Sequence, residues 1–130
     1  MDVGDSRIGL AMSDQLEILA SPMTIISRSV EEEDIGVILN IVRENGIELI
    51  VIGLPFNMDG SLGGQAEKVQ KFAAALGTRT GIPIEFMDER LSTVEAKEKL
   101  RSSRKTDRNT RYDAAAAALI LQGYLDEKAR

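Results

Sequence analysis

Three acidic residues stand where elements of secondary structure are expected to begin or end. Asp2 lies at the end of a short first strand, Glu89 follows a later apolar strand, and Asp113 lies near the start of an Ala-rich helix. Side chains at strand ends in an α/β sheet face the crevice in which ligands bind. We therefore take Asp2, Glu89 and Asp113 as candidate catalytic residues and metal ligands. Asp88 is kept in reserve, because successive strand residues point to opposite faces and only one of the pair can face the site.

The residue types that are missing narrow the chemistry. The chain contains neither His nor Cys, which excludes a thiol nucleophile, a disulfide and a Ser-His-Asp triad. Clustered carboxylates suit hard cations, so the expected cofactor is Mg²⁺ or Mn²⁺. Two such ions about 3.5–4 Å apart can promote in-line hydrolysis of a phosphodiester. The predicted activity is thus that of a metal-dependent nuclease, leaving a 5′-phosphate.

Each acid also has a purely structural interpretation. Asp2 could cap a turn, and Asp88 with Glu89 could be surface charge at a turn. Asp113 could act as an acid at a helix N-terminus, which is worth a few tenths to about 1 kcal/mol. The combination of three such acids in a chain without His or Cys favours the metal interpretation.

Candidate substrate-binding residues are concentrated just ahead of Asp113. The segment 101–111 reads RSSRKTDRNTR and carries five basic residues against one acid. The candidates are Lys105, Arg108 and Arg111, with Arg7 and Arg90 as weaker ones. A solvated loop is the simpler explanation of such a run, and a net charge of −5 opposes binding of a polyanion.

The segment Gly53–Gly64, GLPFNMDGSLGG, is rich in glycine and precedes an expected helix. The free N–H groups of that helix could meet a phosphate, or the segment could be a long connection with an Asp59-Gly60 turn. It does not match GxxxxGK[ST] and is not a P-loop. Both interpretations stay open at this point.

Hydrophobic periodicity predicts one α/β domain over residues 1–130. Met1–Gly4 and Arg7–Ser13 are expected to form a hairpin, and Ile18–Ile26 to complete an antiparallel meander. Ile47–Ile52 and Pro83–Met87 are the two further strands.

Four helices are expected between and after these strands. The first opens with a Ser29/Glu32 capping box and ends at Gly46, and the second presents Val69, Phe72 and Leu76 on one side. The third runs from Ser92 to about Leu100, and the last from about Thr110 to Lys128. The order predicts a mixed five-stranded sheet with helices on both faces. No apolar stretch is long enough to span a membrane, so a cytoplasmic protein is expected.

Five segments together carry a family resemblance. They are DVGDSRIGLAMSD (2–14), ASPMTII (20–26), VIGLPFNMDGSLGGQA (51–66), FMDERLST (86–93) and DAAAAALILQGYLD (113–126). They resemble, in the same order, the YqgF (RuvX) family of Holliday-junction-resolvase-like proteins, described as candidate nucleases of pre-16S ribosomal RNA. In that family several apolar residues usually precede the DxG motif. Only Met1 does so here, so the first strand is expected to be truncated.

The resemblance implies a ribonuclease H-like fold and a bacterial cytoplasmic role in ribosome biogenesis. The implied substrate is the 5′ end of pre-16S ribosomal RNA, with branched DNA as a second possibility. The implied active-site acids are Asp2, the acid within Asp88-Glu89-Arg90, and Asp113.

Two other functions fit parts of the sequence. A non-catalytic ribosome-assembly factor could bind RNA through the basic segment 101–111. A phosphotransferase of the actin and sugar-kinase superfamily also opens with a DxG-containing hairpin, but those enzymes close two such domains around a nucleotide, and 130 residues supply one. The pattern leaves open RNA or DNA, endo- or exonucleolytic cleavage, and the oligomeric state.

Overall fold

The first three strands form the antiparallel meander expected from the sequence. The computed structural model describes residues 1–89 and 108–129, and for 108–113 the backbone alone. Strand β1 (Asp2–Val3) pairs with β2 (Arg7–Ser13), which pairs on its other side with β3 (Ala20–Ser27). The register of β2 and β3 shifts between Leu10 and Ala11, where Ala11 faces Pro22. Among the described residues, β3 pairs with β2 alone, which suits a strand with a proline.

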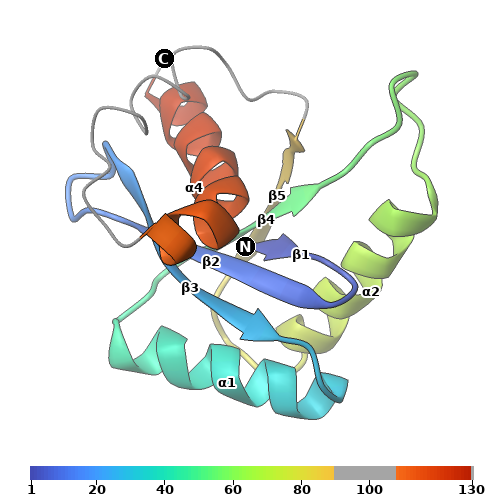
Figure 1. Ribbon diagram of the computed structural model, residues 1–130, viewed down its shortest axis with the longest axis horizontal. Helices are drawn as coiled ribbons and strands as arrows, with labels where there is room; N and C mark the ends of the chain where they lie inside the picture. The colour runs from blue at the N-terminus through green and yellow to red at the C-terminus, as the bar shows by residue number, and fades with distance from the viewer. Residues whose placement is uncertain (90–107, 130) are drawn as a thin grey trace.

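Two parallel strands extend this meander into a mixed sheet. β4 (Ile50–Leu54) pairs in parallel with β5 (Ile84–Asp88). The amino group of Met1 donates a hydrogen bond to the carbonyl of Val51, and the N–H of Gly53 donates to the carbonyl of Met1 over 3.0 Å. These bonds place β1 beside β4, so the five strands lie in the order β3-β2-β1-β4-β5 (Figure 1). The expected α/β architecture is confirmed, with strand pairing split into groups of three and two that meet at Met1.

Helices cover both faces of the sheet, as expected (Figure 1). α1 (Glu31–Glu44) and α2 (Gly64–Gly77) bury Ile38 and Phe72 against the sheet in the main core. α4 (Arg108–Lys128) lies on the opposite face, where Ile120 packs with Val51 and Met87. In the described part of the chain no helix is long and apolar enough to cross a bilayer. The helix expected at Ser92–Leu100 lies outside the described residues.

The predicted capping box at the start of α1 is wrong. The N-cap is Val30, which offers no side-chain hydrogen bond, and the hydroxyl of Ser29 donates instead to Glu33 over 2.8 Å. The backbone N–H of Ser29 donates to the buried carboxylate of Asp34. Asp34 therefore takes the role that the sequence pattern assigned to Glu32.

The end of α1 explains why β4 begins later than expected. Gly46 adopts a φ of +62°, its N–H donates to the carbonyl of Arg43, and the N–H of Ile47 donates to the carbonyl of Val42. These are the two bonds of a Schellman motif, in which the residue after the glycine folds back on the helix. Ile47 belongs to this cap, so the strand starts at Ile50.

A buried glutamine ties α4 to the meander. The side-chain carbonyl of Gln122 accepts a hydrogen bond from the N–H of Ala20, and its amide donates to the carbonyl of Ile18 and to Asp126. Gln122 is fully buried, and these bonds satisfy its polar groups. Asp14 accepts from the N–H groups of Ile18 and Leu19. Because of this turn, β3 begins at Ala20 rather than at Ile18.

The glycine-rich connection after β4 folds into a small hairpin. Phe56 and Leu62 form an isolated bridge, and the Asp59-Gly60 turn is present, with Gly60 at a φ of +87°. The carboxylate of Asp59 accepts from the N–H and the hydroxyl of Ser61. Met58 at the tip is 94% exposed.

Candidate metal centre

Asp2 is the first of the two residues of the short strand β1. Its backbone pairs with Gly9, and the hydrogen bonds of Met1 fix the residue before it against β4. The carboxylate is partly buried, and this burial raises its pKa, while the charge of the Met1 amino group acts in the opposite direction. Burial also lowers the pKa of the Met1 amino group to about 6.

Glu89 directly follows β5 and lies over Gly53 of β4. Its Oε1 atom would be 2.8 Å from a Cβ atom on Gly53, and the Cδ1 atom of Ile120 would be 2.5 Å from the same point. Because Gly53 has no side chain, Glu89 and Ile120 can occupy the space next to its Cα atom. Burial, followed by the charges of Asp2 and Asp88, raises the pKa of Glu89.

The structure thus brings Asp2 and Glu89 to the same edge of the sheet. They come from distant parts of the chain, and the charge of Asp2 acts on Glu89. Met87 is buried against α4 with Ile120, so Glu89, two residues later, points to the same face. Asp88 points to the opposite face by the same alternation. A divalent cation between Asp2 and Glu89 would neutralise their partly buried charges and offset the repulsion between the two carboxylates. This donor set therefore fits a hard metal ion.

The third predicted acid is placed only by its backbone. Asp113 belongs to the second turn of α4, which packs against β1, β2 and β3, and Ala114 and Ala117 next to it are fully buried. The side chain of Asp113 lies outside the described residues. Among the side chains that are described, no group of three potential metal ligands occurs. The three-acid site therefore stays a prediction.

The predicted substrate-binding residues are mostly not placed. Arg90 and Lys105 lie outside the described residues, as do the side chains of Arg108 and Arg111. Arg7 is exposed at the first position of β2, directly after the turn that follows Asp2.

In the sequence, Gly53 stands out only as the start of the glycine-rich segment Gly53–Gly64. It ends a β-branched run, and a glycine inside a strand is the signal that could have marked a close approach of another group. The role of Met1 in joining the two strand groups was also not foreseen.

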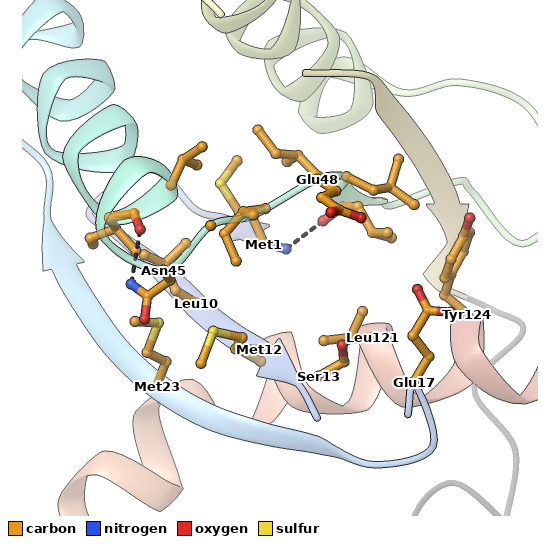
Figure 2. A pocket seen from close by; sticks show the side chains of 18 of the residues that line it. Met1, Leu10, Met12, Ser13, Glu17, Met23, Asn45, Glu48, Leu121 and Tyr124 are labelled. Atoms are coloured by element: carbon orange, nitrogen blue, oxygen red, sulfur yellow. Dashed lines mark hydrogen bonds between the residues drawn. The ribbon is translucent and has the colours of Figure 1, made fainter. Parts of the chain in front are cut away.

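A separate hollow of about 550 Å³ lies beside Met1, which precedes β1. Figure 2 shows it between β2, β4, α1 and α4, with the amino group of Met1 bonded to Val51 at its floor. Its lining combines apolar side chains, such as Leu10 and Met23, with polar ones, such as Asp14 and Glu48. Neither Asp2 nor Glu89 lines it, so the acids and the hollow are different features of the molecule.

Comparison with solved structures identifies the class of fold. The chain is similar to the structure "Thermus thermophilus RuvC structure" with a TM-score of 0.59 and 15% identity, over 98% of this chain and 93% of that one. It matches "T. thermophilus RuvC in complex with Holliday junction substrate" with a TM-score of 0.58 and 17% identity, over 97% and 92%. The expected ribonuclease H-like fold is confirmed.

The sequence comparisons identify the family within that class. The family model described as "RuvX: Holliday junction resolvase" matches residues 1–127. A protein of Dehalococcoides mccartyi is 46% identical over 96% of this chain and 94% of its own length, and one of Crocosphaera subtropica is 44% identical over 98% and 91%. Both carry the name "Putative pre-16S rRNA nuclease". The chain belongs to the RuvX family.

Proposed function

We propose that this protein is a nuclease that hydrolyses phosphodiester bonds with divalent metal ions, and that its substrate is pre-16S ribosomal RNA. The observation that carries the proposal is the meeting of Asp2 and Glu89, whose pKa values are raised by burial and, for Glu89, by the charge of its partner. The names of the relatives support the substrate. The RuvC complex supports nucleic acid as the class of partner.

Mg²⁺ or Mn²⁺ would be held by Asp2, Glu89 and Asp113. Asp88 is the reserve candidate for the place of Glu89. When bound, such ions supply a nucleophile at neutral pH and stabilise charge on the leaving oxygen. The carboxylates must be ionised to bind, so metal binding competes with protonation and should weaken as the pH falls through their raised pKa values. Ile120 closes one side of Glu89 and limits its movement, which serves to hold a ligand in one geometry.

The test compares wild type with Asp2→Asn, Glu89→Gln and Asp113→Asn. The probes are a 5′-labelled RNA covering the 5′ leader of pre-16S RNA, the DNA strand of the same sequence, and a four-way DNA junction. Each is incubated with Mn²⁺, Mg²⁺ or EDTA. The matched control is Glu44→Gln, which neutralises an exposed acid on α1 and should cleave as wild type does.

The expected result is metal-dependent cleavage of the RNA that all three site variants lose. Cleavage that survives the variants or EDTA would exclude this site. Binding of the RNA without cleavage would favour the assembly-factor function, and preferential cleavage of the junction would replace RNA by branched DNA as the substrate.

A further inference from the structure

Arg28 directly follows β3, and its guanidinium group contacts α1, α2 and the turn between β1 and β2. Its Nε donates to Oδ2 of Asp34 over 2.8 Å, and its Nη1 donates to the carbonyl of Gly4 over 2.9 Å. The guanidinium lies 5.0 Å from the centre of the Phe72 ring on α2. The side chain is 22% exposed, so these contacts form in a largely water-excluded place.

The buried carboxylate of Asp34 orients this arginine. Asp34 is 2% exposed, and its second oxygen accepts the N–H of Ser29. Both oxygens are therefore used, and the guanidinium is fixed at Nε while Nη1 is directed to Gly4. Burying such a pair is costly and often contributes little net stability. The geometry of the Arg28–Asp34 pair therefore points to a role other than net stabilisation.

The group that Arg28 holds is the turn after Asp2. The N–H of Gly4 donates to the carbonyl of Arg7 over 2.8 Å, and the backbone N–H of Arg28 donates to the carbonyl of Ser6 over 2.9 Å. With the bond from Nη1 of Arg28 to Gly4, three hydrogen bonds hold the turn at Gly4–Arg7. A Cβ atom on Gly4 would lie 2.8 Å from the carbonyl oxygen of Arg7, so this turn has no room for a side chain at position 4.

β1 needs such an anchor because it is only two residues long. Met1 fixes the chain on the amino side of Asp2, and the turn fixes it on the carboxyl side. We propose that Arg28, oriented by Asp34, is a positioning residue that holds Asp2 in place for the reaction. This inference rests on the proposed function, since it assigns a role at the same site.

The test uses Arg28→Lys, which keeps the charge but cannot bond Asp34 and Gly4 in the same way. Arg79→Lys is the matched control, because Arg79 also donates to a backbone carbonyl, that of Glu32, away from the turn. Three quantities are measured: steady-state cleavage of the labelled leader RNA with Mn²⁺, Mn²⁺ affinity by titration calorimetry, and hydrogen exchange of the Gly4 amide.

In Arg28→Lys we expect kcat to fall roughly tenfold to a hundredfold, because a displacement of about 1 Å has effects of this size. The KM for RNA stays within about twofold, since uniform substrate binding is untouched. Mn²⁺ affinity falls and Gly4 exchanges faster, whereas Arg79→Lys resembles wild type in all three. Free guanidinium at millimolar concentration should partly restore kcat to Arg28→Ala.

The readouts separate the two ideas. If wild type cleaves no probe, the proposed function fails, while Mn²⁺ affinity and Gly4 exchange still decide the role of Arg28. Unchanged Gly4 exchange and Mn²⁺ affinity in Arg28→Lys would overturn the inference. If Arg28→Lys does not fold, Asp34→Asn is judged by the same measurements, and wild-type values in that variant would likewise overturn it.

Discussion

Replacing Gly53 by alanine tests the packing that makes room for Glu89. The added Cβ atom would lie 2.5 Å from Cδ1 of Ile120 and 2.8 Å from Oε1 of Glu89. Carbon atoms in contact are about 3.5–4.0 Å apart, so each neighbour must move by roughly 1 Å. Ile120 is 5% exposed in a cluster with Val51 and Met87, and it cannot move without disturbing them.

Two effects of Gly53→Ala follow from these distances. Overpacking should lower the free energy of unfolding by about 1–3 kcal/mol. The displacement of Glu89 should reduce metal-dependent cleavage of the leader RNA by about 10²-fold. Stability is measured by urea unfolding and cleavage by initial rates at saturating Mn²⁺.

Two further variants serve as controls for this prediction. Gly36→Ala, where nothing lies within 4 Å of the added atom, should stabilise α1 by about 0.5–1 kcal/mol and leave cleavage unchanged. Adding Ile120→Val to Gly53→Ala removes the Cδ1 clash but keeps the Cγ1 atom 3.1 Å from the added Cβ atom, so stability should recover in part while cleavage stays low. Wild-type stability and rate in Gly53→Ala would refute the packing argument.

Three further predictions concern the acids and the buried network. Because burial raises the pKa values of Asp2 and Glu89, and the charge of Asp2 raises that of Glu89 further, Mg²⁺ or Mn²⁺ should raise the melting temperature in calorimetry. Asp2→Asn should abolish most of this shift, and an equal shift in that variant would contradict the site. In the metal-free protein, the folded state binds more protons than the unfolded state at pH values above the ordinary pKa values of 3.8 and 4.5. The free energy of unfolding should therefore fall as the pH rises from these ordinary values through the raised pKa values. In Glu89→Gln the free energy of unfolding should depend less on pH. A pH profile identical to that of wild type would count against this prediction. Gln122→Leu removes buried partners from Ala20 and Asp126, each worth about 1–3 kcal/mol. Urea unfolding should show a loss of about 3 kcal/mol, which the exposed control Gln65→Leu does not share.

Periodicity predicted the elements but not their ends. The strand Arg7–Ser13 and the final helix were recognisable because alternation and helical spacing persist over many residues. The start of β4 was misplaced, because the cap formed by Gly46 and Ile47 is a backbone device that an apolar run conceals. Apolar residues continue from the cap into the strand, with only Glu48 between Ile47 and Leu49.

The candidate acids could be proposed from the sequence, whereas the residues that surround Asp2 and Glu89 could not. Asp2 and Glu89 could be chosen because an acid at a strand end is visible in the sequence. Arg28 and Gly53 could not, because their roles depend on contacts between segments far apart in the chain. Local pattern carries no information about such contacts.

The exposed tip of the hairpin after β4 offers an experimental handle. Met58 is 94% exposed. The connection that carries it follows the carboxyl end of β4, and Glu89 follows the carboxyl end of the parallel strand β5. The chain has no cysteine, so Met58→Cys would create a unique thiol for a fluorescent dye. Emission from that dye could follow the arrival and departure of nucleic acid in real time, without disturbing any buried side chain.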